Sequence, residues 1–298
     1  TLSSQAERSE VFVERFVMTR LIEWPGGPTY WMGGNIMCVS IPFTWNLKEV
    51  HDRLSTKDFT FDEAWVGGPA TKLMPHYFDN LEHVTVKEVY HGAMQIINPQ
   101  ATKTTTGCIR SCGFCAVPKN EGKLAELSEW PDLPVICDNN LLGSSIEHFD
   151  RVIDRLKVHG WADFNQGIDS RLLTDYHANR LREIGRPMIR LALDSMAYAD
   201  QWEVAFDRLR SAEFPKGLIR SYALVAFEDN EKHTVGEAWN RCGWIENHGI
   251  KALPMWYHRL DAMEKNTVTD GQKALGWNDF ERRKIMQWYY QHKEAVGS

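Results

Sequence analysis

The chain has 298 residues, of which 43% are hydrophobic and 25% charged, and its formal net charge is −6 at pH 7. This composition is that of a globular protein, and with no long apolar run and no secretory signal we expect a cytoplasmic protein without membrane association. The negative charge argues against a uniformly basic nucleic-acid-binding surface, although it remains compatible with a local basic groove.

Residues 1–100 predict an N-terminal extension followed by a small, doubly wound, Rossmann-like α/β domain. We expect strands at 36–43 ("IMCVSIPF") and 63–69 ("EAWVGGP"), the second running into a Gly-Gly turn. The stretch "NLKEVHDRL" predicts a helix capped by Asn46. Residues 1–35 carry no readable pattern.

Residues 101–260 alternate between strand-like and helix-like segments. Six short apolar runs predict buried strands, just before Cys108 and at 134–137, 162–167, 188–194, 218–227 and 250–258. Helices are predicted at 144–160, where Ser144 and Glu147 have capping-box spacing, and at 174–185, 198–212 and 234–248. Six such units predict parallel strands joined by right-handed crossovers, that is, a partial (βα)6 TIM-type barrel with its chemistry at the carboxyl ends of the strands. Residues 261–298 predict a helical closing segment whose last helix opens at Asn278.

Three of the six cysteines lie on one loop, in "TTTGCIRSCGFCAVPKNEGKL". Cys108, Cys112 and Cys115 have the spacing C-x3-C-x2-C, which predicts a zinc site, an iron–sulfur site or an unmetallated thiol cluster. Structural zinc sites usually take four protein ligands, and the other cysteines stand alone in the sequence. A cubane cluster held by three cysteines would leave one iron open, which is useful in a catalytic site.

This triplet, with Phe114 directly before its last cysteine, resembles the signature of the radical S-adenosylmethionine (radical SAM) enzymes. The resemblance covers about residues 101–260, because the strand–helix units also match that family's partial barrel. It implies that Cys108, Cys112 and Cys115 bind three irons of a single [4Fe–4S] cluster, and that the fourth iron binds S-adenosylmethionine. One electron, from a reductant such as flavodoxin or ferredoxin, then cleaves the sulfonium, and the 5′-deoxyadenosyl radical abstracts a hydrogen atom from the substrate.

The same resemblance implies further cofactor contacts at the ends of later strands. Many members carry Gly-Gly-Glu after the second strand, to contact the methionine amino group, where this chain has Asp138, Asn139 and Asn140. The remaining implied contacts are Asp194 and Ser195 at the ribose, and Gln166 and Ala226 elsewhere on the cofactor. Asp, Asn and Ser after strands also cap helices or turn the chain, and this alternative stays open.

The Gly-Gly-Pro turn at 67–69 resembles that of cobalamin-binding domains fused to such barrels. The D-x-H-x-x-G motif of those domains is missing, although His51 and His76 are nearby, so we expect a degenerate domain and no cobalamin. In the alternative interpretation Gly67 and Gly68 only make a tight turn.

The sequence says least about the substrate. The stretch "NDFERRKIMQWYYQHK" interleaves basic and aromatic residues, which suits base stacking and phosphate pairing but equally an amphipathic closing helix. Trp256, Tyr257 and His258 are predicted at the barrel mouth as substrate-binding residues. We expect rearrangement or tailoring of a nucleoside or of a base in DNA or RNA, including hypermodified phage DNA in the host cytoplasm. The alternatives are a peptide or small-metabolite substrate, methylthiotransferase-like tRNA modification, and a zinc-stabilised nucleic-acid-binding protein without enzymatic activity.

Overall fold

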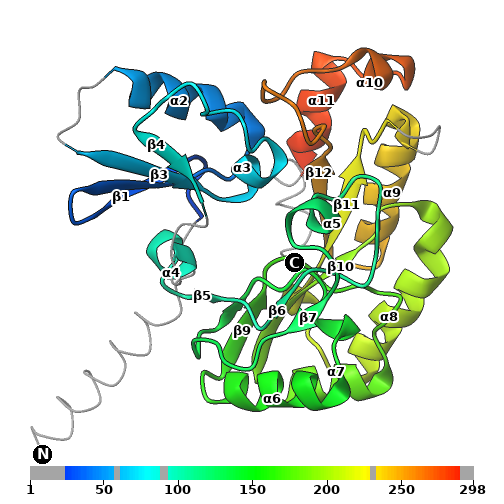
Figure 1. Cartoon of the computed structure of the whole chain (residues 1–298). Helices are drawn as coiled ribbons and strands as arrows, with labels where there is room; N and C mark the ends of the chain where they lie inside the picture. The colour runs from blue at the N-terminus through cyan, green and yellow to red at the C-terminus, as the bar shows by residue number, and fades with distance from the viewer. Residues whose placement is uncertain (1–23, 57–60, 88–92, 229–232, 289–298) are drawn as a thin grey trace, which may run out of the picture.

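The computed structural model describes residues 24–56, 61–87, 93–228 and 233–288, which form an α/β structure with two largely parallel sheets (Figure 1). The smaller sheet belongs to the N-terminal part of the chain and the larger one to the part after residue 100. Each sheet has its own hydrophobic cluster, so the chain buries two separate cores. Within the described residues no helix is both long and apolar enough to cross a membrane.

The smaller sheet has the order β1-β2-β3-β4, with β1 antiparallel to β2 and the other pairs parallel. Its strands are β1 (Thr29–Gly33), β2 (Ile36–Ser40), β3 (Glu63–Gly67) and β4 (Val84–Val86). Its helices are η1 (Thr44–Asn46), α2 (Leu47–Ser55) and α3 (Pro69–Leu73). The two strands and the helix predicted here are present. The predicted cap is wrong, because the Asn46 side chain makes no capping hydrogen bond.

The larger sheet has six parallel strands that lie side by side in chain order. They are β5 (Ala101–Thr102), β8 (Val135–Ile136), β9 (Trp161–Phe164), β10 (Arg186–Ala192), β11 (Ile219–Val225) and β12 (Lys251–Trp256). Each falls in or directly beside a predicted strand. The helices between them are α6 (Ile146–Lys157), α7 (Asp175–Arg182), α8 (Ala199–Ser211) and α9 (Val235–Asn247), with α4 (Ala93–Ile97) before β5.

Smaller elements complete this part of the chain. They are β6 (Thr105–Thr106) and β7 (Ala125–Glu126), which form an antiparallel pair, α5 (Val117–Asn120), η2 (Leu141–Gly143), η3 (Met196–Tyr198), η4 (Lys216–Leu218), α10 (Asp270–Ala274) and α11 (Asp279–Met286). Tyr289, Tyr290 and Lys293, which belong to the predicted basic and aromatic closing segment, lie outside the described residues.

Side-chain caps explain where several helices begin. The Oγ1 atoms of Thr174 and Thr234 and the Oδ1 atom of Asn278 accept backbone N–H bonds at the starts of α7, α9 and α11, as predicted. At α6 the prediction is off by one residue. Ser145, and not Ser144, is the N-cap and accepts from the His148 N–H at 3.2 Å, because Ser144 instead donates to the Leu141 carbonyl at 2.7 Å.

One ion pair lies inside the larger sheet. Arg190 on β10 and Asp163 on β9 have side chains that are only 8% and 5% exposed, and the Arg190 guanidinium donates to both carboxylate oxygens. A charge buried at this depth is tolerable only when it is paired and hydrogen-bonded, so each residue requires the other.

The N-terminal part contacts the larger part near the carboxyl end of β12. Thr44 Oγ1 donates to the Ala262 carbonyl at 2.6 Å, and the Trp45 ring lies 4.6 Å from the His258 ring, measured between centroids. Helix α3 also packs against α5, which directly follows the cysteine loop. The smaller sheet is therefore held next to that loop.

Candidate functional site

The cysteine loop connects β6 to β7 and is tied at its base by a single carboxylate. Glu121 Oε2 accepts the Gly107 N–H at 3.0 Å and an Asn139 Nδ2–H bond at 2.8 Å, while Oε1 pairs with Lys103. Gly107 has φ +68°, and a Cβ atom added there would lie 2.1 Å from the Lys123 carbonyl oxygen. Only glycine permits this closure without moving the backbone.

All six cysteines are free, and they fall into two groups. Cys38, Cys137 and Cys242 are buried, and burial raises the pKa of Cys137 and of Cys242 to about 12, which makes these two thiols inert at neutral pH. The three loop cysteines are partly exposed. The loop cysteines therefore differ from the other three in exposure as well as in their spacing along the sequence.

The loop sulfurs accept hydrogen bonds from their surroundings. Cys108 Sγ accepts from the Arg110 N–H at 3.4 Å and from Asn140 Nδ2 at 3.6 Å, and Cys115 Sγ accepts from the Val117 N–H at 3.5 Å. Burial is the main cause that raises the pKa of Cys112 and Cys115, and the charges of neighbouring loop thiols raise it further. The three thiols thus lie within electrostatic reach of one another, and a metal that binds them must displace their protons.

Within the described residues, no group of three His, Cys, Asp or Glu side chains is gathered around a single ion position. A tetrahedral zinc site needs its ligands to converge on one point, and the loop offers three thiols without a fourth ligand. An iron–sulfur cubane takes each thiolate on a different iron, so its ligands lie further apart. Amide hydrogen bonds to sulfur, as at Cys108 and Cys115, also suit such clusters. The three thiols and the amide hydrogen bonds to their sulfurs are compatible with an iron–sulfur cluster, and zinc is the alternative.

The three residues after β8 have different roles. Asp138 is buried and accepts from the N–H of Thr104 at 2.6 Å and from its Oγ1, and burial is the main cause that raises its pKa. Asn139 is bound to Glu121. Asn140 is only 3% exposed, and its Oδ1 atom has no hydrogen-bond partner among the described residues. Of the three, Asn140 holds an unused acceptor beside the cysteine loop.

Two arginines that sequence reasoning missed surround Asp169. Arg110, inside the cysteine motif, pairs with Oδ2, and Arg171 donates to Oδ1 at 2.7 Å and to Oδ2 at 3.1 Å. Although burial acts to raise the pKa of Asp169, the two guanidiniums hold it below its ordinary value. Both arginines also act to lower the pKa of Cys112. The only sequence signal was the position of "DSR" after the third predicted strand.

The remaining predicted cofactor contacts are spread over several strand ends. Asp194 follows β10, and burial raises its pKa to about 6 against the opposing charges of Arg241 and Arg171. Ser195 accepts from the Ala197 N–H at 3.3 Å and so caps η3, while Gln166 is exposed. Ala226 is fully buried with φ +62°, a conformation that costs a non-glycine residue energy and often marks a functional site.

Aromatic rings extend from the cysteine loop to the end of β12. Phe227, which sequence reasoning missed, lies 5.6 Å from Phe114 and 4.9 Å from Tyr257 between ring centroids, both edge-on. Trp256 is buried and packs edge-on against Trp277 at 5.1 Å. Tyr257 is thus the member of the predicted substrate-binding trio that joins the loop aromatics, whereas Trp256 lies in the core. The third member, His258, lies at the contact with the N-terminal part.

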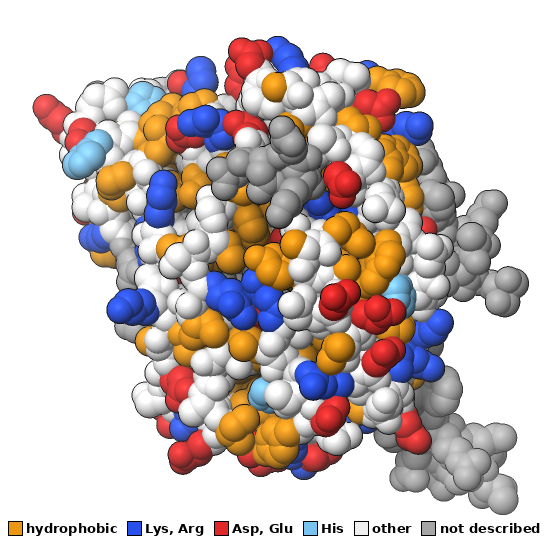
Figure 2. Space-filling view, turned by 90° about the vertical axis from the view of Figure 1, so that its right-hand side faces the viewer, with side chains coloured by type: hydrophobic (Ala, Val, Ile, Leu, Met, Phe, Trp, Pro, Cys, Tyr) orange, Lys and Arg blue, Asp and Glu red, His pale blue; other side chains and the backbone are white. Residues whose placement is uncertain are grey.

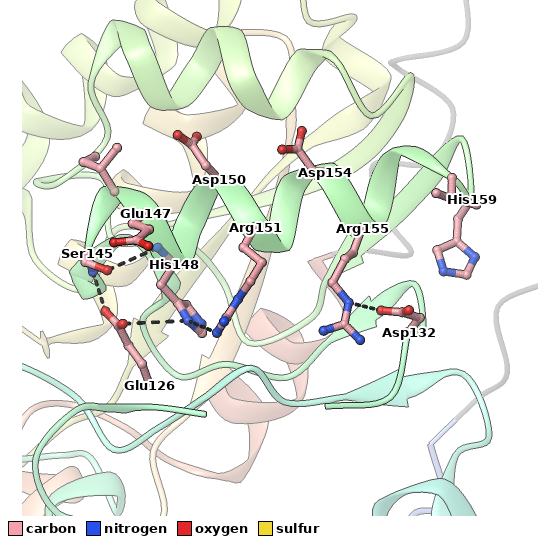
Figure 3. A pocket seen from close by; sticks show the side chains of 12 residues that line it. Glu126, Asp132, Ser145, Glu147, His148, Asp150, Arg151, Asp154, Arg155 and His159 are labelled. Atoms are coloured by element: carbon pink, nitrogen blue, oxygen red, sulfur yellow. Dashed lines mark hydrogen bonds and ion pairs between the residues drawn. The ribbon is translucent and has the colours of Figure 1, made fainter. Parts of the chain in front are cut away.

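A groove of about 1120 Å³ runs along α6, as Figure 3 shows. Several of its charged residues have partners: Arg155 pairs with Asp132, and Asp150 and Asp154 pair with Arg180 beside the groove. Glu126 Oε2 lies 3.8 Å from His148 Nδ1. No cysteine lines it. Because several of its charges have partners and the loop thiols lie elsewhere, we place the candidate site at the cysteine loop.

These features define a class: an α/β protein with a partly exposed thiol triplet beside the parallel strands of its larger sheet. The sequence matches no protein-family model and no curated protein. The function must therefore be argued from the geometry of the loop and of the residues around it.

Proposed function

We propose that the chain is a radical SAM enzyme whose six parallel strands form a partial (βα)6 barrel. The support is the combination of six parallel strands in chain order with a C-x3-C-x2-C loop whose three thiols lie within electrostatic reach of one another. Neighbouring strands that follow chain order are the arrangement of TIM-type barrels, in which the chemistry sits at the carboxyl ends of the strands.

In this proposal Cys108, Cys112 and Cys115 hold three irons of one [4Fe–4S] cluster. When bound, the cluster and S-adenosylmethionine supply one-electron cleavage of the sulfonium and hydrogen abstraction from the substrate. The observation that carries the proposal is the C-x3-C-x2-C loop beside the six parallel strands. Asn140 adds to it, because its Nδ2 donates to Cys108 Sγ and its buried amide oxygen is an acceptor that suits an ammonium group.

Other residues would shape the environment of the reaction. Arg110 and Arg171 place positive charge beside Cys112, which opposes the rise that burial causes in the pKa of this thiol. The rings of Phe114, Phe227 and Tyr257 form an apolar side that excludes water and stray hydrogen donors.

We further propose a nucleoside, or a base in DNA or RNA, as the substrate, and flavodoxin or ferredoxin as the reductant. The aromatic residues near the loop support this choice of substrate, since rings stack on bases. Six free thiols suit a reducing cytoplasm, either the cell's own or that of a phage host. We expect no cobalamin, because the D-x-H-x-x-G motif of cobalamin-binding domains is missing from the sequence.

The test is anaerobic reconstitution followed by iron and product analysis. The wild-type chain should bind about four irons, absorb visible light and release 5′-deoxyadenosine when given S-adenosylmethionine and a strong reductant. Cys112→Ala should lose both the cluster and the release. Cys242→Ala, which removes a thiol that is 0% exposed in the core, should keep both.

The outcomes separate the alternatives. One equivalent of zinc without iron would refute the proposal in favour of a zinc-stabilised protein. A colourless wild-type chain that releases no 5′-deoxyadenosine would refute it as well. Equal loss in both cysteine variants would show that folding, and not the cluster, explains the result.

A further inference from the structure

A cluster of three rings, called the stack below, lies where the N-terminal part meets the end of β12. Phe43 and Trp45 are stacked, with centroids 4.4 Å apart and planes at 11°, and Trp45 contacts His258 at 4.6 Å with the planes tilted at 47°. Phe43 is at the outer end and is 42% exposed. The stack therefore has one open aromatic face, and its rings come from both parts of the chain.

One ring of the stack lies next in the chain to the aromatic residues of the candidate site. His258 directly follows Tyr257, whose ring contacts Phe227, which contacts Phe114 of the cysteine loop. The hydrogen bond from Thr44 to the Ala262 carbonyl holds the segment that carries Phe43 and Trp45 against the segment that follows His258. A molecule lying on Phe43 would thus lie where the two parts of the chain meet, beside the segment that carries Tyr257.

The charges beside the stack are basic. Burial is the main cause that lowers the pKa of His258, and Lys265 and Arg282 lower it further, so both cations lie within electrostatic reach of the ring. The Arg282 guanidinium forms an ion pair with Asp279 Oδ1 at 3.4 Å. Lys265 is exposed and makes no ion pair within the described residues. On the face shown in Figure 2, acidic, basic and hydrophobic side chains are interspersed, so positive charge is local. A neutral aromatic surface with nearby cations is complementary to a base that carries a phosphate.

We propose that Phe43, Trp45 and His258 form a stacking platform for an unpaired base of a nucleic-acid strand, so that the N-terminal part contributes directly to substrate binding. This inference rests on the proposed function for its substrate class. It assigns the N-terminal part the role of holding the strand while a neighbouring nucleotide reaches the cysteine loop.

The test measures binding without turnover, on the metal-free full chain. A fluorescein-labelled single-stranded oligonucleotide is titrated with wild type and with Phe43→Ala, followed by fluorescence anisotropy. Loss of one stacked base should weaken binding about 5- to 100-fold. Tyr176→Ala is the matched control, because Tyr176 is also 42% exposed but lies on α7, and it should leave the dissociation constant unchanged.

A second pair of variants separates stacking from folding. Trp45→Ala should weaken binding and Trp45→Phe should largely restore it, because phenylalanine keeps a ring in the stack. Unchanged binding in Phe43→Ala, equal weakening in Tyr176→Ala, or tight binding of unstructured peptides in place of the oligonucleotide would each overturn the platform.

The readouts also keep the two proposals apart. Release of 5′-deoxyadenosine by the reconstituted wild type, measured without oligonucleotide, tests the radical chemistry independently of strand binding. If wild type binds the oligonucleotide through Phe43 but never cleaves S-adenosylmethionine, the platform is supported and the radical SAM function is refuted. If wild type cleaves S-adenosylmethionine but does not bind the oligonucleotide, the radical SAM function is supported and the platform is refuted.

Discussion

We predict that the free energy of unfolding at neutral pH is lower with the ionised Asp194 than with its uncharged isostere, asparagine, at this position. Burial raises its pKa from 3.8 to about 6, in spite of Arg241 and Arg171, while Asp169 adds to the increase. A shift of about two pKa units corresponds to about 3 kcal/mol. Because part of the side chain still contacts water, we expect about 2 kcal/mol.

The sign follows from proton uptake. Between pH 4 and 6 the folded chain keeps a proton on Asp194 that the unfolded chain has lost, so its stability relative to Asp194→Asn falls as the pH rises through that window. Above the pKa of Asp194 in the folded chain, the full difference in stability between wild type and Asp194→Asn is present. Asp194→Asn should therefore be more stable than wild type at pH 7, by an amount that shrinks towards pH 4.

Urea unfolding of the metal-free proteins across this pH range measures the difference directly. Using metal-free protein keeps the neighbouring thiols protonated, since the pKa of Cys112 and that of Cys115 are both raised. Parallel stability curves for wild type and Asp194→Asn would refute the reasoning. Greater stability of the variant together with loss of 5′-deoxyadenosine release would show that the charge is kept for function and not for folding.

Asp163→Ala should cost about 3–5 kcal/mol in urea unfolding because it leaves Arg190 buried and unpaired, whereas Lys273→Ala, at a pair with Asp270 whose side chains are 61% and 98% exposed, should cost far less. Similar losses would contradict the burial argument. Gly107→Ala should greatly reduce iron uptake, since its Cβ would collide with the Lys123 carbonyl, while Gly243→Ala, on α9 with nothing within 4 Å, should retain it. Full iron loading of Gly107→Ala would exclude the tight turn as a requirement.

Local patterns in the sequence were sufficient to predict the main elements of the fold. The runs that became β8 to β12 are apolar and short, and helices α7, α9 and α11 begin after Thr174, Thr234 and Asn278, where capping is a property of neighbouring residues. The cysteine spacing is likewise local. Capping failed as a guide at Ser144, whose hydroxyl donates to the Leu141 carbonyl instead, and at Asn46, whose side chain makes no capping bond.

Contacts between distant segments could not be predicted. Asp138 was expected to face a cofactor, but its oxygens accept from Thr104, 34 positions earlier in the chain. The pairing of Arg110 with Asp169 spans 59 residues, and the contact of Trp45 with His258 joins the N-terminal part to the segment after β12. No periodicity encodes such pairs, since they depend on how strands and domains come together.

The position of Glu121 has a consequence for assembly. By joining Gly107 and Asn139 with one carboxylate, it closes the segment that carries the three thiols into a small ring before any metal arrives. The conformational entropy of that segment is therefore lost during folding and not during loading. The hydrogen bonds of Glu121 thus fix the loop through groups of the chain itself, independently of what the three thiols bind.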